Sequence, residues 1–171
     1  MINAPTISTA RLTLRAHRQG DFDAYAAAYG DARMVHMGGP LDQRESWAAF
    51  CRDVAQWPLL GHGAWAVDDR ETGTFLGQVG LNKHPYFPEC ELGWLVLPAA
   101  EGKGIAFEAA AAARDWARNT LKPASLVSYV HRDNVRSIKL AERLGASHDA
   151  DAPACPYADH LTYRHPMGEP A

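Results

Sequence analysis

Residues 98–117, PAAEGKGIAFEAAAAARDWA, constrain the fold more than any other segment of the chain. Two glycines flank Lys103 in a turn, and an alanine-rich helical pattern follows over residues 104–120. A helix N-terminus carries unpaired N–H groups and about half a positive charge, and glycines let an anion approach those amides closely. The segment therefore predicts a phosphate-binding strand-to-helix turn. Because glycines more often serve backbone geometry alone, this interpretation needs corroboration elsewhere.

The first third of the chain predicts one strand and two helices. Residues 11–16 alternate apolar and polar side chains as a strand does, and aromatic residues at helical spacing indicate a helix over residues 22–30. Asp42 and Glu45 have the spacing of a capping box for a second helix. We expect Pro58 to limit the extension of that helix, because proline removes a backbone donor.

The remainder predicts a mixed sheet with helices on both faces, an α+β arrangement within the α/β class. Short apolar runs divided by turn residues indicate three strands in an antiparallel meander, at residues 62–69, 73–84 and 90–98. After the helix at 104–120 we expect a strand at 126–130, a helix at 134–144 capped by Gly145, and a last strand at 160–165. A length of 171 residues fits a single domain over 1–171.

Charge and cysteine content exclude several classes of protein. A net charge of -3 gives no electrostatic reason to expect nucleic acid or membrane as a partner, so any basic site must be local. Cys51, Cys90 and Cys155 are odd in number and far apart, which argues against a disulfide framework or a zinc knuckle. We expect a cytoplasmic protein with no metal, because the sequence has no signal-peptide pattern, long apolar stretch or metal-ligand spacing.

A second motif lies in HRDNVRSIKLAERLGA, residues 131–146. Asn134 and Ser137 are three residues apart on the first turn of a helix, so both side chains can face one space. Asn134 is also explained as a simple helix N-cap. The glycine turn at residues 102–104 does not match the GxxxxGK[ST] nucleotide loop. It does not match GxGxxG either, because position 107 is Phe.

Together these motifs resemble the GNAT acetyltransferase superfamily. EGKGIAFEAA resembles its (Q/R)xxGx(G/A) acetyl-CoA loop, and NVRSIKLAERLGA resembles its NxxSxxxxxxxLG helix. TARLTLRAHRQGDFDAY and ELGWLVLP are similar to the RimJ/RimL-like branch, which acetylates protein N-termini. The resemblance covers about residues 9–165 and implies the GNAT fold, with acetyl-CoA as cosubstrate and an amine acceptor. A homodimer is a further expectation left open.

The resemblance assigns the coenzyme-binding residues. The pantetheine arm would pair with the backbone of a splayed strand, with the N–H of Leu95 polarising the thioester carbonyl. Lys103 would add positive charge, and Arg132, Arg136 or Lys139 would bind the 3′-phosphate or remain solvated. Glu101 departs from the Gln or Arg of relatives and must point outward, and Phe107 stands where the branch often has Thr. The strand residues are Trp94, Leu95, Val96 and Leu97, and the pyrophosphate would bind the amides of Gly102, Lys103, Gly104, Ile105, Ala106 and Phe107.

The resemblance also implies the catalytic residues. Ser137 would protonate the departing thiolate, or serve only as a helix-turn hydrogen bonder, and Asn134 would bind the pantetheine arm. Glu91, on the face that it shares with Glu89, is the expected base, with His84 and His131 as rivals. Alternatively, Glu91 is a carboxylate on the sheet surface without a catalytic role, or the enzyme has no dedicated base. Cys90 has no paired base, so an acetyl-cysteine route is disfavoured.

The acceptor is not specified by the sequence. Relatives acetylate protein N-termini or small amines, and fold analogy does not decide among them. The alternative to an N-acetyltransferase is an acyl-CoA-binding regulatory module with weak or absent catalysis, to which Glu101 and Phe107 lend weight. The expected walls of the acceptor pocket, which ordinary core packing would also explain, are His36, Met37, Trp57, His84, Tyr86, Phe87 and Tyr157.

Overall fold

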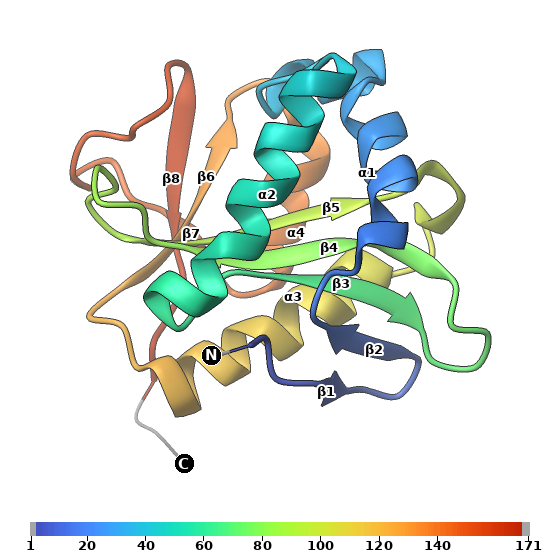
Figure 1. The fold of residues 1–171 in the computed structure, drawn as a ribbon. Coiled ribbons are helices and arrows are strands. Elements are labelled where there is room, and N and C mark those ends of the chain that lie inside the picture. The colour runs from blue at the N-terminus through green and yellow to red at the C-terminus, as the bar shows by residue number, and fades with distance from the viewer. Residues whose placement is uncertain (1–2, 169–171) are drawn as a thin grey trace.

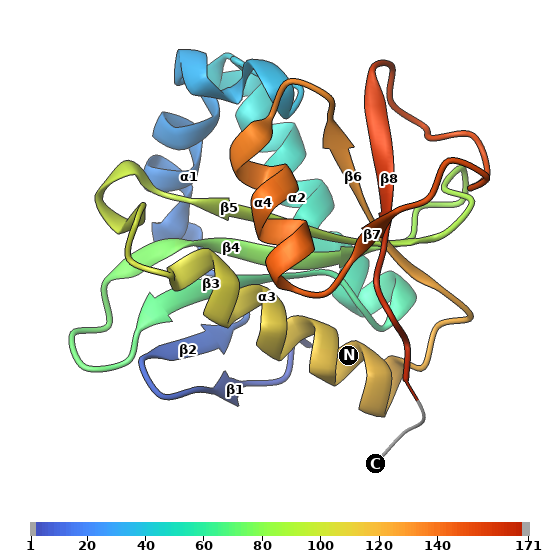
Figure 2. The same cartoon turned by 180° about the vertical axis from the view of Figure 1, so that it is seen from behind.

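The computed structural model describes residues 3–168, which form one mixed sheet covered by helices on both faces (Figures 1 and 2). The strands are β1 (Ile7–Ser8), β2 (Leu12–Arg15), β3 (Ala64–Asp69), β4 (Phe75–Asn82), β5 (Cys90–Val96), β6 (Leu126–His131), β7 (Ser147–His148) and β8 (His160–Arg164). The helices are α1 (Phe22–Tyr29), α2 (Gln43–Leu60), α3 (Ile105–Trp116) and α4 (Val135–Arg143). Within these residues, no helix is both long and apolar enough to cross a bilayer.

The strand order confirms the predicted mixed sheet. The strands lie in the order β1-β2-β3-β4-β5-β6-β8-β7, and β5 with β6 is the parallel pair among otherwise antiparallel neighbours. Two hairpin connections join β3, β4 and β5 into the predicted meander, and α3 crosses from β5 to β6. Helices α1 and α2 cover one face, while α3 and α4 cover the other (Figures 1 and 2). The two helical layers therefore meet opposite sides of the β5 and β6 pair.

Alanines allow α3 to pack closely on the sheet. Ala110, Ala113 and Ala117 are fully buried, and they belong to the main core cluster together with Trp65 and Leu92. Small side chains bring the helix backbone near the strands, so the alanine run has a packing role as well as a helix propensity. A π-helical turn, Ala117–Leu121, extends α3 beyond Trp116. This packing fixes the start of α3 beside the end of β5.

Helix α2 begins at the predicted capping box and ends two residues after Pro58. The Asp42 carboxylate accepts from the Glu45 N–H at 2.7 Å, and the Glu45 carboxylate accepts from the Asp42 N–H at 2.9 Å, which confirms the capping box. Pro58 lies inside the helix, and α2 extends only two residues beyond it, to Leu60. Near a helix end proline removes one backbone donor, while the buried Trp57 anchors the last turn by donating to the Ala64 carbonyl.

We predict that Gly77→Ala destabilises the fold beside the site. Gly77 has a φ of +151°, and an added Cβ would lie 2.2 Å from the Leu95 carbonyl oxygen. One of the two strands must shift, so we expect the free energy of unfolding to fall by about 1–3 kcal/mol. Urea unfolding measures the change. Gly20→Ala is the control, because a Cβ there meets nothing within 4 Å. An equal loss in both variants contradicts the prediction.

Candidate active site

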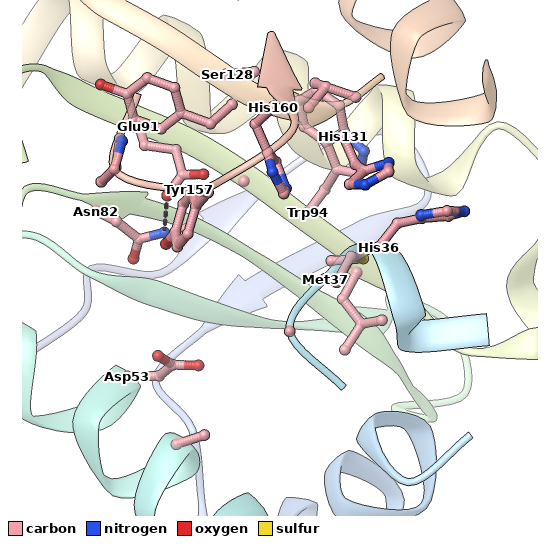
Figure 3. Close-up of a pocket in the computed structure, with 18 of the residues that line it drawn as sticks. His36, Met37, Asp53, Asn82, Glu91, Trp94, Ser128, His131, Tyr157 and His160 are labelled. Atoms are coloured by element: carbon pink, nitrogen blue, oxygen red, sulfur yellow. Dashed lines mark hydrogen bonds between the residues drawn. The ribbon is translucent and has the colours of Figure 1, made fainter. Parts of the chain in front are cut away.

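A cavity of about 1000 Å³ lies where the start of α4 meets the sheet, and none of residues 101–107 of the predicted phosphate loop lines it (Figure 3). One half runs between β5 and β6 towards α4, where Asn134 and Ser137 line it. The other half lies between α2 and the strands β4 and β5, where Asp53 and Glu91 line it. The cavity thus connects the region predicted for the pantetheine arm with the region predicted for the acceptor.

Strands β5 and β6 diverge after a short pairing. Their register contains only Cys90 opposite Leu126 and Glu91 opposite Val127. Beyond those residues the cavity extends between the strands, with Trp94 on one side and Val130 on the other. The backbone of β5 on this edge therefore has no strand partner, as the splayed strand of the resemblance requires.

Ser128 bridges the strands at the point of divergence. Its hydroxyl donates to the Leu92 carbonyl at 2.6 Å and lies 2.9 Å from His165 Nε2. Burial lowers the pKa of His165 to about 4, and the charges of Arg114 and Arg118 add to this decrease. A neutral imidazole then donates its Nε2 hydrogen to the hydroxyl, whose own hydrogen is already used. Sequence analysis missed this pair, although a serine within an apolar strand was the available signal.

The register of β5 corrects the predicted oxyanion donor. Leu97 donates its N–H to the Leu76 carbonyl, so Leu95, two residues earlier, also directs its peptide groups towards β4. The N–H groups of Trp94 and Val96 alternate with them and point to the open edge. The donor available to the cavity is therefore Trp94 and not Leu95. Trp94 and Leu95 line the cavity, whereas Val96 and Leu97 lie beyond its lining.

The predicted phosphate loop has unpaired backbone donors. Gly102 and Gly104 have φ angles of +71° and +76°, values that other residues rarely adopt. Gly104 is the N-cap of α3, and the first helical bond runs from the Glu108 N–H to its carbonyl. Among the described residues, none accepts a hydrogen bond from the N–H groups of 102–107. These donors converge at a helix N-terminus, a suitable arrangement for an anion.

Arg11, from the segment before β2, supports this loop from behind. Its guanidinium donates to the Lys103 carbonyl at 2.9 Å and to the Glu108 carboxylate at 2.7 Å. Lys103 is exposed, Ile105 is buried in the core and Ala106 is half-buried. The loop is therefore held by bonds to a carbonyl and a carboxylate, which leave its amides unpaired within residues 3–168. Sequence analysis missed Arg11, because the contact spans distant parts of the chain.

Both departures from the loop pattern, Phe107 and Glu101, have partners within the protein. The ring of Phe107 packs against the core, and the Arg143 guanidinium carbon lies 4.8 Å from its centroid. The Glu101 carboxylate binds Arg33 at 2.5 Å and Arg136 at 2.7 Å. Glu101 is therefore neutralised by arginines from two other elements, a contact that the sequence did not predict.

Glu91 is a buried carboxylate that accepts a hydrogen bond from the described residues on only one of its two oxygens. It is 8% exposed, and one carboxylate oxygen accepts from Asn82 at 3.2 Å (Figure 3). Burial raises the pKa of Glu91 to about 7, with the Asp53 charge adding to the rise and the Asn82 hydrogen bond opposing it. Glu89 does not join it, because its carboxylate binds Arg164 at 2.6 Å and lies outside the cavity lining. Of the two predicted carboxylates, only Glu91 reaches the site.

Asn134 caps α4 and also lines the cavity. Its side-chain oxygen accepts from the Ser137 N–H at 3.1 Å, which leaves its amide nitrogen available. The Ser137 hydroxyl lines the same space and has no hydrogen bond to any residue in the described range 3–168. Arg132 lies 3.5 Å from Asp159, and Lys139 is exposed. The two interpretations of Asn134, cap and site residue, are thus compatible.

Three imidazoles gather beside Trp94 at the mouth of the groove (Figure 3). The ring centroids of His36 and His131 are 4.5 Å apart, and those of His131 and His160 are 5.2 Å apart. Within residues 3–168 no such group has the geometry to hold a metal ion. His131 Nδ1 accepts from the Asp133 N–H, so this nitrogen is not available as a base. Burial and the Arg52 charge lower the pKa of His84.

The structure corrects two of the predicted acceptor walls. Trp57 packs against Trp65 and Trp116 in the core, with centroids 4.6 and 5.6 Å away, and does not line the cavity. Phe87 is 2% exposed and packs against Tyr129. Both side chains are in the core because burying a large apolar ring is more favourable than leaving it exposed at the rim of a pocket. The predicted wall residues that do line the cavity are His36, Met37, His84, Tyr86 and Tyr157.

The floor of the acceptor half was not predicted. Gly80 of β4 lies opposite Gly93 of β5, so no side chain rises from the sheet there. Asp53 of α2 faces this floor and accepts hydrogen bonds from Tyr25 and Gln78 at 2.9 and 3.1 Å. Helical periodicity alone gives no sign that this aspartate meets the sheet, so no sequence signal was available.

The geometry agrees with the comparisons to known proteins. The family model described as an acetyltransferase (GNAT) domain matches residues 11–147. The chain belongs to the GNAT family. A solved acetyltransferase from Agrobacterium tumefaciens is 45% identical, with a TM-score of 0.90 and 96% of each chain covered. A putative ribosomal-protein-serine acetyltransferase from Vibrio cholerae is 23% identical, with a TM-score of 0.77, 96% of this chain and 98% of that chain being covered.

The GNAT fold neighbours include a RimL-like enzyme. RimL, a ribosomal L7/L12 alpha-N-protein acetyltransferase solved in complex with coenzyme A, is 16% identical with a TM-score of 0.76, over 94% of this chain and 97% of that chain. GNAT proteins use acyl-CoA, and this chain offers matching groups. The free amides of 102–107 suit a diphosphate, and the open edge of β5 suits an amide-bearing chain.

We predict that Ser128→Ala weakens the junction of β5 and β6 in this GNAT protein. The substitution leaves the buried Leu92 carbonyl and the His165 Nε2 hydrogen without their partner. Unpaired buried groups of this kind cost about 1–3 kcal/mol, so urea unfolding should show a loss of that size. Ser147→Ala, at an exposed position in β7, is the control. A Ser128→Ala variant as stable as the control contradicts the bridging role.

Proposed function

We propose that this protein transfers the acetyl group of acetyl-CoA directly to a primary amine, either a protein N-terminus or a small-molecule amine. The observation that carries the proposal is one cavity that joins the open edge of β5, Asn134 and Ser137 to the buried carboxylate of Glu91. Coenzyme A in the RimL structure supports the coenzyme half of the proposal through the shared fold. In this arrangement the protein mainly aligns two reactants, and alignment alone contributes a large part of such rate enhancements.

Backbone groups hold the coenzyme in this proposal. The amides of 102–107 bind its diphosphate, and the N–H of Trp94 and the side-chain amide of Asn134 face its pantetheine arm. Bound there, the coenzyme supplies an acetyl thioester. The Trp94 N–H is a fixed donor for the carbonyl oxygen on which negative charge develops. Such a preorganised donor contributes about 3 kcal/mol to lowering a barrier.

Glu91 is the proposed base. A protonated amine is not a nucleophile, so the acceptor must give up a proton before or during attack. With a pKa of about 7, Glu91 is ionised in a large fraction of molecules at neutral pH and still basic enough to accept that proton. The Asn82 hydrogen bond to one oxygen fixes the carboxylate and leaves the other oxygen for the amine or a bridging water.

Ser137 is the proposed proton donor to the departing thiolate. Its hydroxyl lines the groove and is not engaged by any residue within 3–168, so it can turn towards the sulfur. The serine stands on the first turn of α4, which the Asn134 cap holds in place. Donation through a fixed helix start keeps the hydroxyl at a defined position relative to the groove.

The acceptor half of the cavity favours an amine on electrostatic grounds. Glu45, Asp53 and Glu91 line it, against the single guanidinium of Arg52. A low-dielectric cavity with an excess of carboxylates attracts ammonium groups and raises their local concentration. The alternative function, a coenzyme-binding module without chemistry, does not account for a buried glutamate with a raised pKa beside the groove.

We predict that Glu91→Gln lowers kcat/KM by about 10²–10⁴-fold, because general-base catalysis has that magnitude. In the wild type, kcat/KM should rise with pH around an apparent pKa near 7, since only the ionised carboxylate accepts a proton. The variant should lack this rise. Steady-state rates across a panel of amines and pH values provide the measurement. Glu71→Gln, in the exposed turn after β3, is the control, and a Glu91→Gln variant with an unchanged pH profile refutes the base assignment.

We predict that Ser137→Ala lowers kcat by about 10²-fold while the affinity for acetyl-CoA is unchanged, because proton donation to the leaving group is lost. Calorimetry gives the affinity, and single-turnover rates give the chemical step. If the wild-type protein binds acetyl-CoA saturably but acetylates no amine of the panel, the coenzyme-binding module is the correct function. Absence of any binding heat at millimolar acetyl-CoA would exclude both the acetyltransferase and the coenzyme-binding module.

A further inference from the structure

Glu101 occupies an unusual electrostatic position for a residue at the start of a coenzyme loop. In the loop pattern that the chain resembles, this position is Gln or Arg, and a carboxylate there repels a diphosphate. The structure shows that the carboxylate is shared by two guanidiniums, Arg33 at 2.5 Å and Arg136 at 2.7 Å. The Glu101 carboxylate therefore holds two arginine side chains beside the loop, and neither arginine is part of the loop motif.

The two arginines come from two different elements, and neither lines the cavity. Arg33 lies on the 3-10 turn Ala32–His36 after α1, and Arg136 lies on the first turn of α4. Arg33 also binds Asp31 through its Nε atom at 3.0 Å, and Lys103 follows Glu101 by two residues in the loop. Among the described residues, Arg33 Nη2 has no hydrogen-bond partner. Each guanidinium retains donors that can bind a second anion.

We propose that Arg33 and Arg136 bind the diphosphate of the coenzyme, and that Glu101 holds the two side chains until the diphosphate arrives. This inference rests on the coenzyme binding of the proposed function. A diphosphate offers more charge and more acceptor oxygens than a carboxylate, and guanidinium binds phosphate in a bidentate manner. The side chains of Arg136 and Glu101 are 69% and 26% exposed, so the ion pair between them is weak and readily exchanged.

The proposal predicts opposite effects at the two ends of one ion pair. Arg33→Gln and Arg136→Gln each remove a phosphate ligand, so the Kd for acetyl-CoA should rise about tenfold. Glu101→Gln removes the carboxylate that competes for the arginines, so the Kd should fall about threefold. A purely structural ion pair predicts the same sign for all three variants. Arg44→Gln, at an exposed arginine on α2, is the control and should not change the Kd.

Isothermal titration calorimetry of the full-length variants measures these changes, with thermal melting to confirm that each variant is folded. Acetyl dephospho-CoA keeps the diphosphate but lacks the 3′-phosphate, so the same fold-changes are expected with it. Equal weakening by Glu101→Gln and the arginine variants overturns the proposal, as does a loss that disappears with the dephospho compound. If these Kd shifts occur in a protein that acetylates no amine, the inference stands and only the proposed catalysis fails.

Discussion

The divergence of β5 from β6 is the constraint on which the rest of the site depends. A parallel pair in the middle of a sheet normally continues its ladder, because unpaired backbone groups in a sheet interior are costly. Here the ladder stops after two residue pairs, and Ser128 supplies a side-chain bond to Leu92 where the next backbone bond is missing. The neutral His165 behind it completes this bridge without adding a charge to the core. The open edge of β5 that results is a position where an extended ligand can take the place of a strand.

Charge is distributed unevenly around this opening. The whole chain carries a net charge of -3, yet Arg11, Arg33, Lys103 and Arg136 surround the start of α3. The acceptor half of the cavity holds a cluster of carboxylates with one arginine. In the proposed function, a polyanionic coenzyme and a cationic amine would therefore be attracted to different regions of the protein. Glu91 belongs to this acceptor half, and burial raises its pKa to about 7, so it is partly ionised at neutral pH as its proposed role as a base requires.

Local sequence patterns predicted the elements of the fold and the loop, but not the contacts between them. The capping box at Asp42, the glycine turn and the start of α4 depend on neighbouring residues, so their patterns were readable. The pairing of Glu101 with Arg33 joins residues far apart in sequence, and the burial of Trp57 depends on rings from β3 and α3. The orientation of the Leu95 peptide was mistaken for a related reason. It depends on a register with β4, and no single strand encodes its own register.

The bare floor formed by Gly80 and Gly93 has a consequence for specificity. Gly80 and Gly93 leave one bare patch on the sheet, so the shape of the acceptor space there is set by α2, by the turn after α1 and by the loops before β5 and β8, together with strand side chains on either side such as Gln78 and Glu91. Loops and helix faces tolerate substitution better than paired strands, so relatives can change their acceptors while the coenzyme edge stays constant. The buried Asp53, held by Tyr25 and Gln78, is the fixed polar feature of this variable half. In the proposed function, the acceptor half therefore combines fixed carboxylates with walls formed by loops, whereas the coenzyme half combines backbone amides with arginine side chains.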